Sequence, residues 1–269
     1  VKGCLNNGFD INKANLLFSY IEKFASYGFN KAHSVGYGKI TCMMAYIKAH
    51  YKSIFYEALL NVNQESGERR KKIFYEIRKN KISINKPSIL LSDYDFISDD
   101  NSITYGLTNI STIKDNVASI IINERNVEPF NDVYDFVIRM VKHDVSMQMI
   151  DDLVYAGALD CFNIPRSKLI ANMNSLYNFA TMFKGMDYLP NSYKDDKYSF
   201  FNIPLFLKND LETDYLKKEY EMLGVYLSTH PISKIKKSMD KQFTNIVEIN
   251  DDGNYNIVGK ISLIEFKKT

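Results

Sequence analysis

Apolar positions recur along most of the chain at the three- to four-residue spacing of amphipathic helices. This spacing predicts helices through residues 16–24, 40–51, 54–59, 66–80 and 163–185, and a further helix running from 211 through 215–232. Between residues 81 and 106 the period shortens to two, and the segments 93–97 and 102–106 flank an Asp-Asp-Asn turn, which predicts a β-hairpin. The predicted fold class is therefore mainly α, with a small β element near the middle of the chain.

The helix predicted after residue 38 carries a regular apolar stripe, which we expect to be buried. The stripe consists of Ile40, Met43, Met44, Ile47 and Tyr51. A glycine-punctuated polar loop precedes it, and the N–H groups and positive dipole end of a helix start suit a phosphate. The candidate residues for a triphosphate pocket there are Asn30, Lys31, His33, Ser34 and Tyr37. A capped helix start with a solvated lysine is the simpler alternative.

Residues 106–162 alternate short helices with tight turns, which is typical of paired helix-hairpin-helix units. The first turn falls at residues 114–116, and the second unit opens at Pro129 and closes at Phe162. Such hairpins hold duplex DNA without reading its sequence, by directing turn N–H groups and cations at phosphates. The candidate DNA contacts are Lys48, Lys114, Asn116, Arg139, Lys142, Arg166 and Lys168. The alternative, which we keep open, is that these helices serve only as a scaffold.

The charge pattern restricts the chemistry further. Lys+Arg of 34 against Asp+Glu of 32 gives a net charge of only +2, so nucleic-acid contacts must come from local patches. The cationic run at residues 69–72 is typical of a solvated helix face, and gives only weak support for DNA contact. The acidic pairs at 99–100, 195–196 and 251–252 lie in predicted turns or linkers, and the pair at 151–152 lies in a predicted helix of the hairpin region. All four fit turn or cap roles better than metal ligation, and no His/Cys spacing indicates zinc.

Length and composition set the broad class. A chain of 269 residues with 45% hydrophobic content should hold more than one domain. No apolar run approaches the roughly 20 residues of a membrane span, and no signal peptide is visible. The scattered Cys4, Cys42 and Cys161 are expected to be buried thiols of a cytoplasmic protein. The chain begins in a helical pattern and ends in a lysine-rich strand, so we expect a piece of a larger protein.

Long motifs resemble those of the C-family bacterial replicative DNA polymerases, the DNA polymerase III alpha subunits. The run YGFNKAHSVGY at 27–37 and the ending KAHY at 48–51 are similar to the fingers of that family. LVYAGALDCF at 153–162 and YLKKEYEMLGVYLSTHPI at 215–232 are further matches. The chain departs from the family at Gly36 and Gly38, where relatives usually have alanine. It also lacks the glycines of the first hairpin turn, where it has Thr112, Lys114 and Asn116.

The resemblance implies a domain order. It comprises fingers at 1–80, a β-hairpin connector at 81–106, a tandem helix-hairpin-helix region at 107–185, a linker at 186–210, a helical connection at 211–241, and the start of a truncated OB-fold at 242–269. It also implies that the parent enzyme performs DNA-templated DNA synthesis with Mg²⁺ and dNTP. The catalytic palm would lie upstream of Val1, so the fragment alone is expected to be inactive. The rival hypothesis is a non-catalytic helix-hairpin-helix scaffold of a repair factor.

The resemblance finally implies partners. They are primer-template duplex, a sliding clamp and other subunits of the polymerase III holoenzyme. Relatives carry a short clamp-binding peptide in the linker, and NIPLF at 202–206 matches it with Leu205 and Phe206 as anchors. A register at 197–201 is the weaker match. The other interpretation is that the linker packs its aromatic residues onto its own domain.

Overall fold

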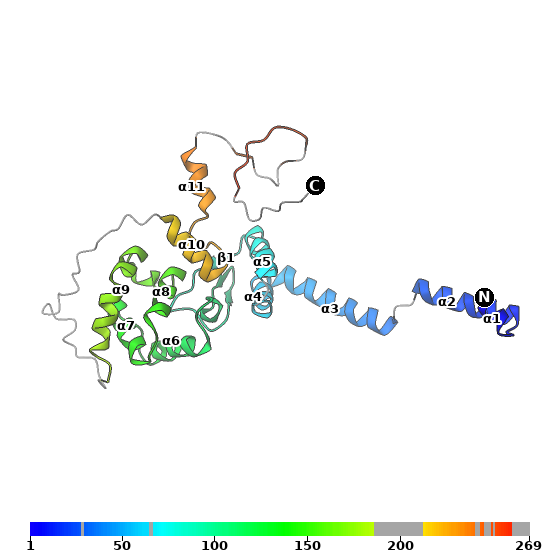
Figure 1. Cartoon of the computed structure of the whole chain (residues 1–269), viewed down its shortest axis with the longest axis horizontal. Coiled ribbons are helices and arrows are strands. Elements are labelled where there is room, and N and C mark those ends of the chain that lie inside the picture. Colours follow the sequence, from blue (N-terminus) through cyan, green and yellow to red (C-terminus); the bar gives the residue numbers. More distant parts are fainter. Residues whose placement is uncertain are drawn as a thin grey trace. The chain divides into compact units, whose positions relative to one another are not determined.

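The structure is a computed structural model that describes residues 1–27, 30–64, 67–185, 212–239, 243–244, 249 and 251–259 (Figure 1). The chain divides into two compact units, Val1–Lys52 and Ser53–Thr269. We call them the N-terminal unit and the C-terminal unit and describe each by itself.

The N-terminal unit consists of helices. They are α1 (Lys2–Asn6), α2 (Ile11–Tyr27) and α3 (Lys31–His50). Asp10 starts α2, because its carboxylate accepts hydrogen bonds from the backbone N–H groups of Asn12 (2.9 Å) and Lys13 (3.1 Å). Asn30 starts α3 in the same way, since its side chain accepts from the N–H of Ala32 at 2.9 Å. The predicted helices of this region are therefore confirmed, and α3 begins nine residues before the predicted apolar stripe.

The expectation that the stripe on α3 is buried is wrong. Ile40 keeps 57% of its surface exposed, and Met43, Met44 and Tyr51 are exposed as well. Among the described residues of this unit, Ala14 of α2 is the one buried apolar side chain. A helical period shows that a face is apolar, but burial needs another element to cover it, and no residue of α3 is buried. For the same reason Cys42 is exposed rather than buried, while Cys4 and Cys161 are partly buried.

The C-terminal unit holds the core. Its helices are α4 (Lys52–Val62), α5 (Gly67–Lys79), η1 (Leu107–Asn109), α6 (Asp115–Val127), α7 (Val133–Lys142), α8 (Met147–Ala156), η2 (Asp160–Phe162), α9 (Arg166–Thr181), α10 (Glu212–Leu223) and α11 (Pro231–Ser238). One contiguous cluster of buried apolar residues runs from Tyr56 of α4 to Val225 after α10. No helix in the described residues combines the length and apolar character that crossing a membrane requires.

A three-stranded sheet joins α5 to the hairpin region. Its strands are β1 (Ser83–Asn85), β2 (Ile97–Asp99) and β3 (Ser102–Thr104), in the order β1-β3-β2. β2 and β3 form the predicted antiparallel hairpin, with Ser98 opposite Ile103. β1 pairs with β3 in parallel. β2 begins at Ile97 rather than at residue 93, because Phe96 turns into the core against Tyr105, with ring centroids 4.7 Å apart.

Helices α7, α8 and α9 pack together, and α10 packs against α8 (Figure 1). Each hairpin helix has a defined start and stop. Asp132 caps α7 by accepting from the N–H of Asp135 (2.9 Å), and Ser146 caps α8 by accepting from that of Met149 (3.3 Å). α8 ends at Gly157, whose φ of 86° closes the helix in the left-handed conformation. Helices α8 and α10 lie in contact although more than fifty residues separate them in the sequence.

Two predicted details need correction. The stretch 215–232 is not one helix, because Gly224 adopts a φ of 70° and Pro231 starts a new helix, α11. The first hairpin opens with the single 3₁₀ turn η1 instead of a full helix. The helical placement predicted for Asp151 and Asp152 is confirmed, since both lie inside α8. The turn assignment is confirmed for Asp100, while Asp99 is the last residue of β2 and accepts from the backbone N–H of Asp100.

The proposed clamp anchors Leu205 and Phe206, with the linker at 186–210, lie outside the described residues. Most of the proposed OB-fold segment, 242–269, lies outside them as well, and its described part at 251–259 contains no strand.

Candidate nucleic-acid interface

The start of α3 presents most of the predicted nucleotide-binding residues on one accessible turn. The side chains of Lys31, His33, Ser34 and Tyr37 are all exposed, and that of Asn30 is exposed while it caps the helix. The rings of His33 and Tyr37 contact each other, with centroids 4.2 Å apart and planes inclined by 52°. This confirms that residues four apart share one side of the turn. Lys48 lies near the far end of α3 and is half-buried.

The electrostatics of this turn favour an anion. The first turn of α3 carries no acidic side chain, so nothing there neutralises the positive end of the helix dipole. The unpaired N–H groups of a helix start bind phosphate oxygens well. Lys31 at the first helical position adds a full positive charge to this field. Whether a nucleotide binds there stays a prediction.

The first hairpin turn places cationic and amide side chains in the solvent. Lys114 and Asn116 are exposed at the start of α6, where Lys114 occupies the N-cap position without a side-chain capping bond. Lys142 closes α7, and Lys168 lies in the first turn of α9; both are half-buried. None of these three lysines forms an ion pair within the described residues. Their charges are thus free to meet phosphates.

Arg139 has a different environment from these lysines. Its guanidinium donates to the backbone carbonyls of Glu124 (3.0 Å) and Glu128 (2.9 Å) and to the carboxylate of Asp135 (2.9 Å). It also lies over the ring of Phe130, 4.1 Å from the centroid. The side chain is only 11% exposed. Arg139 therefore fastens α7 to the end of α6, and its charge is satisfied inside the protein.

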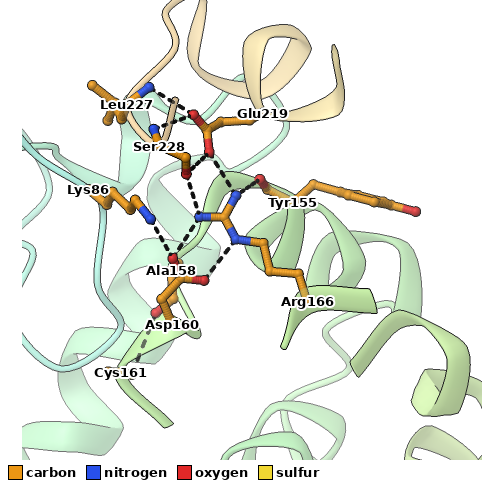
Figure 2. A network of polar contacts seen from close by, with 9 residues as sticks. All are labelled: Lys86, Tyr155, Ala158, Asp160, Cys161, Arg166, Glu219, Leu227 and Ser228. Atoms are coloured by element: carbon orange, nitrogen blue, oxygen red, sulfur yellow. Dashed lines mark hydrogen bonds and ion pairs between the residues drawn. The ribbon is translucent and has the colours of Figure 1, made fainter. Parts of the chain in front are cut away.

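Arg166 is the centre of a larger polar network (Figure 2). Its guanidinium binds Asp160 with two parallel hydrogen bonds of 2.8 and 2.7 Å, the strong forked geometry of an arginine–carboxylate pair. It also donates to the backbone carbonyl of Tyr155 (3.0 Å) and to the carboxylate of Glu219 (2.8 Å). Arg166 is 13% exposed and Glu219 is fully buried. The network joins α9, the turn after α8, and α10.

Further partners complete the network around both carboxylates. Lys86 pairs with Asp160 at 2.9 Å, and Glu219 accepts from the N–H groups of Leu227 and Ser228, each at 2.8 Å (Figure 2). Burial raises the pKa of the Asp160 carboxyl, but its hydrogen bonds and ion pairs with Arg166 and Lys86 outweigh burial and leave the pKa below the usual range. Burial likewise raises the pKa of Glu219, but hydrogen bonds from Ser228 and Arg166 outweigh burial and leave the pKa below its usual value, so both groups are held as carboxylates.

Gly157 makes room for this network. A Cβ at that position would lie 2.1 Å from Nη2 of Arg166, and the φ of 86° is itself unfavourable for other residues. The glycine of the sequence motif LVYAGALDCF therefore has a packing reason. Arg166 and Arg139 were both predicted DNA contacts, and the structure gives each of them internal partners instead.

Two residues that line a pocket in the C-terminal unit, Arg70 and Asn109, are not among the candidates predicted from the sequence. Arg70 turns inward from the cationic run, while Arg69, Lys71 and Lys72 are exposed as predicted. It lies four residues before Phe74 on the apolar side of α5, and this spacing could have distinguished it from its neighbours. No sequence signal marks Asn109, which is buried in the 3₁₀ turn η1.

Two comparisons identify what this arrangement is similar to. The sequence family described as "Helix-hairpin-helix motif" matches residues 81–169, which covers β1 to the start of α9. The chain is also similar to proteins named DNA polymerase III subunit alpha. It is 32% identical to that of Bacillus subtilis over 244 residues, 33% identical to that of Chlamydia pneumoniae over 251, and 31% identical to that of Thermus aquaticus over 255.

These alignments cover 90%, 89% and 93% of this chain, but 22%, 20% and 20% of the relatives. The chain therefore spans about a fifth of the length of the curated relatives it matches, and along nine tenths of its own length it resembles one segment of them. The resemblance deduced from the motifs is confirmed, and it extends well beyond the helix-hairpin-helix region.

Proposed function

We propose that this chain is the segment of a DNA polymerase III alpha subunit that contributes fingers residues and a tandem helix-hairpin-helix region to DNA-templated DNA synthesis. The observation that carries the proposal is the similarity along nine tenths of the chain to proteins of that name. The repair-scaffold alternative has no comparable support, since the relatives named above are polymerase subunits.

In this proposal the two units have different tasks. The start of α3 contacts the incoming dNTP, with Lys31 and His33 toward the phosphates. The hairpin region holds the sugar-phosphate backbone of the duplex through Lys114, Lys142 and Lys168, whose charges have no internal partner among the described residues. Arg139 and Arg166 position the hairpin helices rather than touch DNA.

The Mg²⁺ ions that such a polymerase uses need converging carboxylates. Within the described residues, no three His, Cys, Asp or Glu side chains come together in a way that could hold a metal ion. These residues do not fit a metal centre, and we derive no chemical step from them. Mg²⁺ and the reacting triphosphate are accordingly proposed for the parent enzyme.

Duplex binding tests the hairpin part of the proposal. The full chain should bind a duplex of about 20 base pairs without sequence preference, and its affinity should fall linearly on a logarithmic salt scale. Replacing Lys114, Lys142 and Lys168 together by glutamine should reduce the slope by about three, because each phosphate contact releases about one counterion. Lys13→Gln on α2 is the matched control. An unchanged slope in the triple variant would contradict the assignment.

Nucleotide kinetics test the fingers part. In the full-length enzyme Lys31→Ala should raise the KM for dNTP, since a charged hydrogen bond contributes about 1.5–3 kcal/mol. Lys39→Ala changes the same charge two turns further along α3 and should leave KM unchanged. Equal kinetics for wild type and Lys31→Ala would refute this role.

Clamp binding is the finer part of the proposal. Leu205 and Phe206 stand in a polar, irregular sequence, NSYKDDKYSFFNIPLFLKND, and short peptides concentrate binding energy in few apolar anchors. Replacing both by alanine should weaken sliding-clamp binding about a hundredfold or more, from about 1.5–3 kcal/mol per buried side chain. The Phe200 and Phe201 double variant is the control for the other register. Equal clamp binding by the Leu205/Phe206 variant would exclude this motif.

A further inference from the structure

A pocket of about 500 Å³ lies in the C-terminal unit, bordered by the start of α5, by η1 and the turn before α6, and by the end of α10. This volume is within the range of about 300–1,000 Å³ that small-molecule sites occupy. Residues 30–37 at the start of α3 do not take part in it. The pocket is thus a second candidate site, and Lys114 is the one lining residue that the proposed polymerase function also uses.

The pocket wall is rich in positive charge. Arg70, Lys71 and Lys114 all line it. Lys71 pairs with Glu68 at 2.9 Å, but neither Arg70 nor Lys114 has a carboxylate partner among the described residues. The lining carboxylate Glu221 is itself paired with Lys218 at 2.9 Å. A net positive charge therefore remains at the wall.

Arg70 is held in place without being neutralised. Its guanidinium donates to the hydroxyl of Tyr105 (2.6 Å) and to the backbone carbonyl of Gln64 (3.3 Å), and it lies 5.7–6.0 Å from the ring centroids of Phe74, Phe96 and Tyr105. Burial raises the pKa of Tyr105 to about 12, so its phenol is neutral and offers no counter-charge. The aromatic cluster fixes the guanidinium in a conformation suited to receive an anion.

Asn109 supplies the independent observation. It lines the same pocket and is only 7% exposed, yet neither its amide nitrogen nor its amide oxygen has a hydrogen-bond partner in the described structure. Buried polar groups are almost always paired, and an unpaired one destabilises a protein. An asparagine amide carries a donor and an acceptor side by side, which is the pattern that matches the polar edge of adenine. Both amide atoms of Asn109 are covered, so the side chain has to turn toward the pocket to pair with a base.

We propose that this pocket binds a nucleoside polyphosphate, with its phosphates at Arg70, Lys71 and Lys114 and the polar edge of its base toward Asn109. Phosphate oxygens beside a base occur both in a free nucleotide and along a DNA strand. The test distinguishes these two sources.

The experiment titrates the full chain by calorimetry with ATP, with inorganic tripolyphosphate, and with ATP in the presence of a 20-base-pair duplex. Wild type should bind ATP more tightly than tripolyphosphate. Lys114→Gln should weaken both by about three- to tenfold, because an exposed charged contact is lost. Asn109→Leu should remove the preference for ATP. Lys168→Gln, which changes charge outside the pocket, should bind ATP like wild type, and Lys31→Ala reports separately on the nucleotide site proposed at α3.

Each result has a definite meaning. If the duplex displaces ATP from wild type but not from Lys114→Gln, the site is supported and its ligand is a DNA strand. Binding of ATP unaffected by duplex would support a free nucleotide. No ATP binding at about 1 mM, or a weakening by Lys168→Gln equal to that by Lys114→Gln, would overturn the proposal. An effect of Lys31→Ala alone would overturn it too, and would place the nucleotide at α3. Wild-type preference for ATP in Asn109→Leu would refute the role of the amide.

Discussion

Helix α3 and the hairpin region contain similar apolar stripes but differ in what surrounds them. On α3 the stripe from Ile40 to Tyr51 is largely solvent-exposed, whereas on α6 the positions of Val117 and Ile121 are buried in the core cluster. The difference shows that amphipathic spacing specifies an element, while stability depends on which other elements cover it. Charged side chains differ in the same way. Lys31 on α3 is exposed, whereas Arg166 in the hairpin region is hydrogen-bonded to four residues: Asp160, Tyr155, Glu219 and Ser228.

The Arg166 network should give the largest effect. Arg166→Met leaves the buried carboxylate of Glu219 without its cation, which should lower the free energy of unfolding by about 3–5 kcal/mol. Urea denaturation followed by circular dichroism measures this. Lys168→Met, two residues further along α9, should change stability by less than about 0.5 kcal/mol. A loss below about 1 kcal/mol for Arg166→Met would show that the network is not a stabilising element.

A matched pair of isoleucines tests the comparison directly. Ile121→Ala removes a fully buried side chain and should lower the free energy of unfolding by about 2–4 kcal/mol. Ile40→Ala removes an equally large side chain from α3, where it is exposed, and should change stability by less than about 0.5 kcal/mol. The same urea experiment applies to both. Similar losses in the two variants would mean that α3 is covered in solution.

Asp151 should make the stability depend on pH in an unusual direction. Burial and the neighbouring Asp152 raise the pKa of Asp151 to about 6 in the folded protein. The folded state then binds more protons than the unfolded state between pH 4 and 6, so this group lowers stability as pH rises through that window. Asp151→Asn should therefore stabilise the protein by about 1–2 kcal/mol at pH 8, allowing for partial exposure. At pH 4 it should have no effect, and a gain there would contradict the pKa assignment.

The smallest effect is expected at the cap of α3. Asn30→Ala removes the side chain that accepts from the N–H of Ala32, which should destabilise the helix start by about 1 kcal/mol. Amide hydrogen exchange should quicken in residues 31–36, while the urea midpoint of the C-terminal unit stays unchanged. Ser34→Ala, an exposed change on the same turn without a capping role, is the control. A shift of that midpoint by Asn30→Ala would show that the cap stabilises both units.

Much of the secondary structure follows from the sequence because its signals are local. The helical spacing of the apolar residues Ile73, Phe74 and Ile77 predicts α5, and the Asp-Asp-Asn turn predicts the β2–β3 hairpin. Gly224 and Pro231 are local signals of the break between α10 and α11, because glycine adopts the positive φ that ends a helix and proline favours the first turn of the next one. What could not be predicted depends on distant partners. Nothing near Arg166 in the sequence reveals that Glu219, 53 positions later, pairs with its guanidinium.

The contacts between α10 and the hairpin helices have a consequence for how the polypeptide can be divided. Arg166 of α9 pairs with Glu219 of α10, and α8 packs on α10. The N–H of Ser111 donates to the carbonyl of Met222 at 3.0 Å. The covalent connection through residues 186–211 is therefore not what holds α10 against α8. Two separately produced polypeptides, one ending before residue 186 and one starting at 212, should assemble into the same unit, much as the halves of a split reporter protein do.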